Sequence, residues 1–229
     1  MMAIVFSDEH LEAFQTMAMV GEWKEQEPAA WVESVGIPNL SSAFSQQKMT
    51  RKFLKQSSLD RSVSDRDLLW GILAWGKMRR DAARRFAQNE DPWIKVIRSL
   101  RGENLTRLDS YSLCAETVAG NPSGGIGPAY YTKLIFFANP RHDGYIMDQW
   151  TSRSVNLLVS GDPIVAMRTS NHVSPQNSAE TYETYCRIVE TLSKLLMDKN
   201  PEETERCLFS TGGGNNKRAQ WRKHVMTNG

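Results

Sequence analysis

The chain has 229 residues, a net charge of +2, 40% hydrophobic residues and a mean hydropathy of −0.48. This length suits one globular domain or two small packed subdomains, and no apolar stretch is long enough to span a membrane. The near-zero net charge neither favours nor excludes a nucleic-acid partner. The N-terminus lacks the basic region of a signal peptide, so we expect a cytoplasmic protein.

Metal-binding patterns are missing from the sequence. Cys114, Cys186 and Cys207 are widely separated, which indicates reduced thiols and is too few for an iron–sulfur cluster. The four histidines form no paired zinc motif. We therefore expect no metal site.

Helical periodicity dominates the chain and predicts an all-α fold, a two-lobed helical bundle. Cap signals begin several of the helices, among them Ser7 with Asp8, Ser64 with Asp67, and Asp91 with Pro92. No alternating pattern lasts long enough to build a sheet. We predict helices over residues 7–20, 41–56, 64–80, 93–101, a stretch ending near 118, 129–137, 149–158, 179–199 and 201–209.

Basic residues gather in three runs. In the first, Lys48, Lys52 and Lys55 recur at helical spacing with no acid among them. The second covers 77–85, and the third is a basic C-terminal tail over 212–229. Such clusters predict contacts with a phosphate backbone, although a solvated helix face or a disordered tail gives the same pattern in any single run.

A glycine turn at Gly125-Ile126-Gly127-Pro128 carries more information. Glycines allow a positive φ and close backbone approach, Ile126 can pack between two helices, and Pro128 suits a first helical turn. Such a turn presents main-chain N–H groups at a helix N-terminus, where they can hold a phosphate oxygen. We expect Gly125, Ile126 and Gly127 to contact DNA.

This turn resembles the helix-hairpin-helix motif, and the residues after it resemble the GPD superfamily of DNA glycosylases. In that superfamily a catalytic aspartate follows the hairpin at a helix N-terminus; here Asp148 lies 21 residues after Gly127, with Arg153 at the expected separation. The residues from Gly125 to Trp150 are most similar to those of bacterial proteins with an 8-oxoguanine DNA glycosylase fold. The resemblance implies one glycosylase-like unit over 1–229, with the helix-hairpin-helix at about 110–137 and the aspartate loop with its helix at 138–159.

Two positions depart from the superfamily pattern. Bifunctional members carry a lysine two residues after the second glycine, where this chain has Ala129; Lys133 stands one helical turn further on. Either Lys133 reaches the same sugar carbon or the enzyme is monofunctional. Trp150 replaces a common histidine, which weakens a phosphate contact there and leaves a stacking surface.

The chemistry of base removal explains these residue types. Breaking an N-glycosidic bond develops positive charge on the sugar, which a carboxylate such as Asp148 stabilises. A lysine amine could instead attack C1′ and form a Schiff base, and Lys133 is the candidate. The flipped base needs an aromatic pocket, for which five side chains are available: Trp70, Trp75, Tyr130, Tyr131 and Trp150.

The resemblance therefore implies a monomeric DNA glycosylase acting on double-stranded DNA. The base would be an 8-oxoguanine-like purine or a hypermodified base of bacteriophage DNA, the second making it a defence enzyme. A helix-hairpin-helix module that binds DNA without catalysis remains the alternative. We expect no cofactor, with a monovalent cation at the hairpin carbonyls left open.

Overall fold

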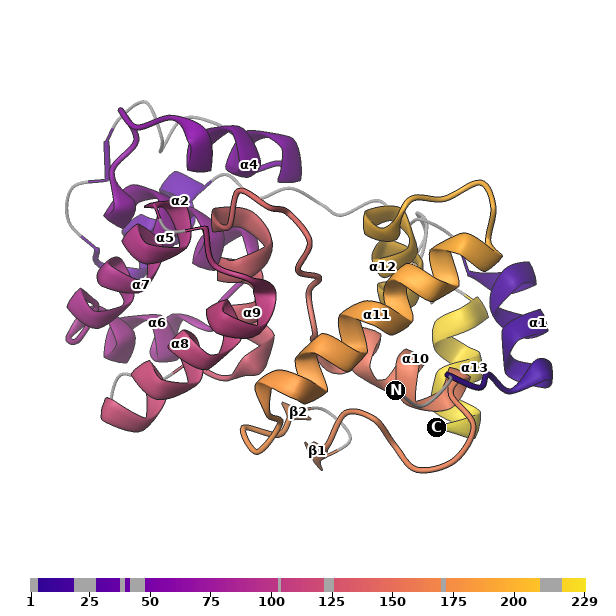
Figure 1. The fold of residues 1–229 in the computed structure, drawn as a ribbon. Helices are drawn as coiled ribbons and strands as arrows, with labels where there is room; N and C mark the ends of the chain where they lie inside the picture. The colour runs from indigo at the N-terminus through magenta and orange to yellow at the C-terminus, as the bar shows by residue number, and fades with distance from the viewer. Residues whose placement is uncertain are drawn as a thin grey trace. The chain divides into compact units, whose positions relative to one another are not determined.

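The structure is a computed structural model that describes residues 4–18, 28–37, 40–41, 48–102, 104–121, 126–169, 172–210 and 220–229. These residues are mostly helical, which confirms the all-α prediction. The chain divides into two compact units, one over Lys24–Gly144 and one joining Met1–Trp23 to Tyr145–Gly229. Figure 1 shows the helices of each unit. None of the described helices has the length and apolar character needed to cross a bilayer.

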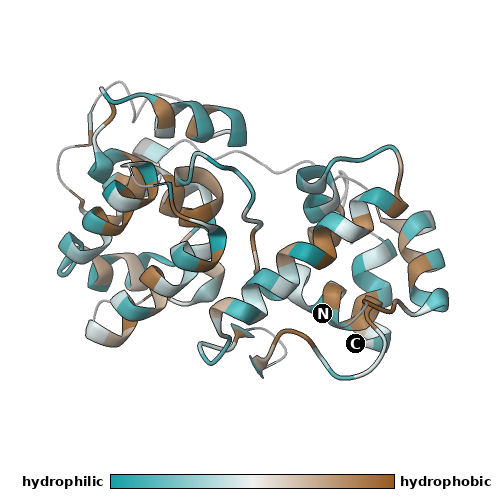
Figure 2. Cartoon of the chain, in the orientation of Figure 1, coloured by the Kyte–Doolittle hydropathy of each residue, from teal (hydrophilic) through white to brown (hydrophobic). Residues whose placement is uncertain are grey.

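The Lys24–Gly144 unit is built around α5 (Asp65–Trp75), which packs against α2, α4, α7 and α9. Ser64 caps α5 by accepting a hydrogen bond from the Asp67 N–H at 3.0 Å. Hydrophobic residues colour much of α5 and α9 in Figure 2, as expected for buried helices. The other helices of this unit are α2 (Pro28–Val35), α4 (Arg51–Leu59), α6 (Arg80–Ala87), α7 (Asp91–Gly102), α8 (Arg107–Gly120) and α9 (Pro128–Ala138).

The second unit is built around α10 (Gln149–Leu158), which contacts every other helix of the unit. The N-terminal segment joins it, because the Ser7 N–H donates to the Leu158 carbonyl at 2.9 Å and the Ser160 N–H donates to the Val5 carbonyl at 2.9 Å. The remaining elements are α1 (Asp8–Met17), β1 (Met167–Thr169), β2 (His172–Val173), α11 (Ala179–Leu195), α12 (Pro201–Phe209) and α13 (Gln220–Asn228). The two strands pair antiparallel.

Several element boundaries differ from the sequence prediction. Residues 42–47 of the helix predicted over 41–56 lie outside the described residues. Helix α4 begins at Arg51, because the Thr50 hydroxyl accepts a hydrogen bond from the Phe53 N–H at 2.9 Å and caps it there. Lys48 therefore precedes the helix, and its predicted place on one face with Lys52 is wrong. The helices predicted to residues 80 and 199 end at Trp75 and Leu195.

Among the described residues, five elements were not predicted: the helices α2, α6 and α13, and the strands β1 and β2. Helix α13 lies in the predicted basic tail, where Trp221 and Val225 are fully buried. Burying these two side chains holds residues 220–228 in a helix, whereas the rest of that tail, 212–219, lies outside the described residues.

Candidate active site

Asp148 is the N-cap residue of α10. Its Oδ1 accepts hydrogen bonds from the N–H groups of Trp150 at 2.8 Å and Thr151 at 3.1 Å, and its own N–H donates to the Thr151 hydroxyl at 2.9 Å. This reciprocal arrangement is a capping box. Among the described residues Oδ2 accepts no hydrogen bond, and the side chain is half-buried. One oxygen therefore fixes the carboxylate at the positive end of α10, while the other is available to a ligand.

The segment before Asp148 is anchored by side chains from elsewhere in its unit. The Tyr185 hydroxyl donates to the Ile146 carbonyl at 2.6 Å, and the Thr151 hydroxyl donates to the same oxygen at 2.9 Å. The Tyr182 hydroxyl donates to the Tyr145 carbonyl at 2.9 Å. This role of the two tyrosines was not predicted, although their three-residue spacing in a helical stretch places them on one face.

The predicted hairpin lies between α8 and α9. Ile126 is buried at 3% exposure, as expected for a side chain packed between helices. Gly127 is exposed and caps α9 with φ −81°, so this position does not use the positive φ that glycine allows. A Cβ at Gly127 would meet nothing within 4 Å, which leaves open space for a backbone to approach the first turn. Gly125 lies outside the described residues.

Lys133 is buried, with 7% of its surface exposed. Its Nζ reaches back one turn and donates to the Ala129 carbonyl at 2.5 Å, and it lies 5.3 Å from the centre of the Tyr130 ring. Gly76 at the end of α5 makes room for it, because a Cβ there would lie 3.0 Å from the Lys133 Cδ. The amine is thus held against the main chain of Ala129, one helical turn before Lys133.

The candidate aromatic residues divide by burial. Trp70, Trp75 and Tyr131 are core residues with at most 4% exposure, whereas Tyr130 and Trp150 are half-buried. Burial raises the pKa of Tyr130 above its usual value, and the hydrogen bond and charge of Arg79 lower it by a smaller amount. Only the half-buried pair keeps ring surface that a base could contact.

Trp150 and Arg153 are tied to α13. The Arg222 guanidinium lies 4.3 Å from the centre of the Trp150 ring, and the Arg153 guanidinium lies 5.4 Å from it. Arg153 also donates from Nη2 to the carbonyls of Val225 at 3.3 Å and Gly229 at 3.4 Å. Arg153 therefore holds the end of α13, and Arg222 is a second cation at Trp150 that the sequence analysis did not single out.

The first basic run belongs to the Lys24–Gly144 unit. Lys48 and Lys52 are exposed, whereas Lys55 stacks its amine 4.3 Å from the centre of the Phe136 ring on α9. Arg51 stacks on the same ring at 4.8 Å. These contacts place α4 against α9, so Lys52 lies on a helix packed against α9, and Lys48 lies three residues before that helix begins.

No group of three or more His, Cys, Asp or Glu side chains in the described part of the chain could hold a metal ion. The three cysteines are buried as free thiols, and burial raises the pKa of Cys207 to about 11.

Comparison with known proteins identifies a family that the chain matches. Residues 18–209 match the family model described as "Putative 8-oxoguanine DNA glycosylase OGG-like protein". No curated protein and no solved structure matches the chain. The matched range includes the hairpin, Lys133 and Asp148, and it ends before α13.

Proposed function

The chain belongs to the 8-oxoguanine DNA glycosylase OGG-like family, and we propose that it is a DNA glycosylase that releases a damaged or modified base from double-stranded DNA. The observation that carries the proposal is the Asp148 carboxylate, which is held through Oδ1 at the start of α10 and keeps Oδ2 available. The match to the family model covers this residue, which lies 21 positions after Gly127.

Asp148 acts on the sugar and not on the base. As the N-glycosidic bond breaks, its electron pair leaves with the base and positive charge develops on C1′ and the ring oxygen. The Oδ2 oxygen stabilises that charge and orients the water that adds to C1′. Because Oδ1 is held by two N–H groups, the carboxylate does not have to reorient during the reaction.

The DNA backbone is held by the hairpin and by exposed basic side chains. The open space at Gly127 admits a phosphate to the first turn of α9, where N–H groups and the helix dipole favour an anion. Lys52 on α4 and Lys48 just before that helix add positive charge to the same unit. These contacts position the duplex without reading its sequence.

Lys133 supplies a second step, cleavage of the strand. Its amine adds to C1′ of the abasic sugar, and the adduct loses water to form a Schiff base. Removal of a proton from C2′ then breaks the bond between C3′ and its phosphate, and the phosphate leaves with the electron pair. The specific support is the amine itself, which is buried and held at residue 129.

The proposed base is an oxidised purine related to 8-oxoguanine, because the family description points to that class. A hypermodified base of bacteriophage DNA, such as glucosylated hydroxymethylcytosine, is the other candidate. The two differ in the shape that the pocket must accept, so a substrate panel separates them.

The test of the glycosylase uses duplexes that carry 8-oxoguanine, uracil, an alkylated purine or glucosylated hydroxymethylcytosine. Asp148→Asn keeps an oxygen that can cap α10 and removes the charge, so we expect unchanged stability and a loss of base release of about 100-fold or more. Asp148→Ala also loses the cap, at a cost of about 1 kcal/mol. Base release undiminished in Asp148→Asn would refute the mechanism. DNA binding without release from any duplex would favour the non-catalytic module.

The test of Lys133 is borohydride trapping of the Schiff base. We expect wild type to form a covalent complex with damaged DNA and to cut the strand without alkali. Lys133→Gln should lose both, while Lys95→Gln, which removes an exposed lysine of the same unit, should keep both. Strand cleavage that needs alkali in the wild type would show a monofunctional enzyme.

A further inference from the structure

The segment Tyr145–Met147 leads directly into Asp148 and is buried without being a helix or a strand. Buried main-chain carbonyls need hydrogen-bond partners, and a segment outside regular structure must find them in side chains. Two tyrosines of α11 provide them, Tyr182 for the Tyr145 carbonyl at 2.9 Å and Tyr185 for the Ile146 carbonyl at 2.6 Å.

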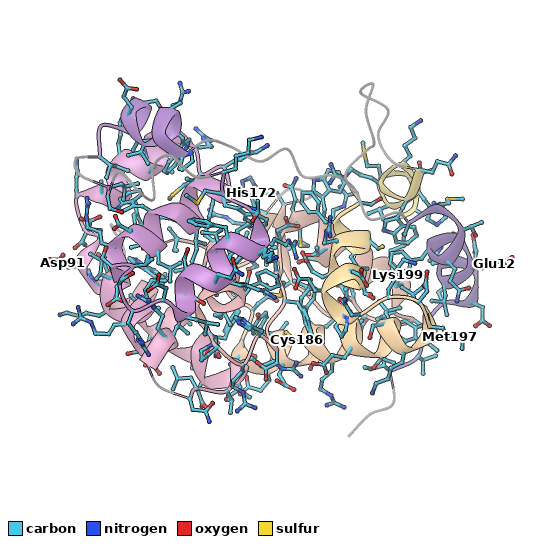
Figure 3. All side chains as sticks on the ribbon, turned by 90° about the horizontal axis from the view of Figure 1, so that it is seen from above. Glu12, Asp91, His172, Cys186, Met197 and Lys199 are labelled. Atoms are coloured by element: carbon cyan, nitrogen blue, oxygen red, sulfur yellow. The ribbon has the colours of Figure 1, made fainter. Side chains whose placement is uncertain are left out.

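The two tyrosines form one rigid group. They lie three residues apart on α11, both are fully buried, and their rings stack with centres 6.3 Å apart and planes 13° apart. Cys186, the next residue after Tyr185, marks their place on α11 in Figure 3. Well-packed rings of this kind have little freedom to change rotamer, so their hydroxyl groups are fixed in position.

The two hydroxyl bonds are not equivalent for Asp148. The Ile146 carbonyl that Tyr185 holds also accepts the Thr151 hydroxyl at 2.9 Å. That hydroxyl in turn accepts the Asp148 N–H at 2.9 Å, and the Thr151 N–H donates to Asp148 Oδ1 at 3.1 Å. Tyr185 is thus connected through Ile146 and Thr151 to the Asp148 carboxylate, whereas the carbonyl that Tyr182 holds lies one residue further from it.

Tyr185 lies near two carboxylates. Burial raises the pKa of Tyr185 well above its usual value, and the charges of Glu205 and Asp148 raise it further, while the hydrogen bond to Thr151 opposes them. Glu205 is itself buried at 1% exposure on α12. Burial and these two charges therefore favour the protonated hydroxyl, which donates to the Ile146 carbonyl.

We infer that Tyr185 is a positioning residue for Asp148, which acts through the Ile146 carbonyl and Thr151 to hold the carboxylate in its reactive orientation. This inference rests on the proposed glycosylase function. It assigns Tyr182, which makes the same type of bond from the same helix, a structural role only. A small displacement of a catalytic group can cost roughly 100-fold in rate, so losing the Tyr185 bond should reduce the rate measurably.

The experiment compares Tyr185→Phe with Tyr182→Phe as a matched pair. Each removes one buried hydroxyl that donates to one carbonyl of the same segment, so we expect similar losses of stability in urea unfolding. Under single-turnover conditions with saturating enzyme, we expect base release to slow by about tenfold or more in Tyr185→Phe and by less than about twofold in Tyr182→Phe. The Kd for DNA should be unchanged in both. Equal rates in the two variants would overturn the inference.

A second readout does not depend on activity. Hydrogen exchange of the Trp150 and Thr151 amides, which bond to Asp148 Oδ1, should become faster in Tyr185→Phe and stay as in wild type in Tyr182→Phe. If no duplex releases a base, the proposed function fails, and the amide exchange still decides whether Tyr185 holds Asp148. Unchanged exchange in Tyr185→Phe overturns the inference whatever the activity.

Thr151 tests the intermediate link by rescue. Thr151→Ser keeps the hydroxyl and should keep the single-turnover rate within about threefold, whereas Thr151→Val removes it at nearly the same volume and should slow release at least as much as Tyr185→Phe. Adding Tyr185→Phe to Thr151→Val should produce little further loss, because both act on one connection. Fully additive losses would overturn the inference.

Discussion

The buried side chain of Arg101 helps to hold the Lys24–Gly144 unit together, and replacing it measures this contribution. Its side chain is 2% exposed, and it donates to the carbonyls of Ser58 at 2.9 Å, Val63 at 2.9 Å and Asp60 at 2.6 Å. It also forms an ion pair with Asp65 Oδ1 at 2.8 Å. The guanidinium therefore joins the end of α4 to the start of α5, the central helix of the unit.

We expect Arg101→Met to lower the free energy of unfolding by about 3–5 kcal/mol. This is the usual cost of removing one partner of a buried ion pair, and hydrogen bonds to a charged group contribute roughly 1.5–3 kcal/mol each. The sum of the individual bonds overestimates the loss, because water can reach the exposed Asp60 region. Since domains are stable by roughly 5–15 kcal/mol, the variant should approach unfolding at moderate urea concentration.

Arg98→Met is the matched control. Arg98 pairs with the other oxygen of the same carboxylate at 3.1 Å, but its side chain is 71% exposed, so its removal should cost about 1 kcal/mol or less. Urea unfolding followed by circular dichroism measures both variants. A loss below about 1 kcal/mol in Arg101→Met, or equal losses in the two, would refute the argument that burial gives this ion pair its importance.

Two further predictions concern Lys133 on α9 and Tyr111 on α8. Gly76→Ala should press on the Lys133 side chain and slow Schiff-base trapping several-fold with little change in stability, whereas Gly102→Ala, where a Cβ meets nothing within 4 Å, should leave trapping unchanged. Burial raises the pKa of Tyr111 to about 12, so the folded state keeps a proton that the unfolded state loses near pH 10. Stability should accordingly fall by about 2–3 kcal/mol between pH 10 and 12, and Tyr111→Phe should reduce that fall when urea midpoints are followed against pH.

Features that depend on neighbouring residues could be predicted from the sequence. The helical periodicity of α5 and α11 follows from the 3.6-residue repeat, and it led directly to the all-α fold. The position of Asp148 at the start of α10 is also local, because the capping residue and its partners lie within three positions. The reach of Lys133 to Ala129 spans one helical turn, which sequence spacing alone suggests.

Other features depend on contacts between distant parts of the chain, which no local pattern contains. The hydrogen bond from Tyr185 to Ile146 joins residues that are 39 positions apart in the sequence. Gly76, which leaves room for the Lys133 side chain, lies at the end of another helix. From its sequence, α13 was predicted to be part of a basic tail. It forms a helix because Trp221 is buried, and the Trp221 ring packs on Phe14 near the opposite end of the chain. Local propensity therefore determined which segments are helical and where the aspartate lies, whereas tertiary packing decided which side chains hold that aspartate and shelter the lysine.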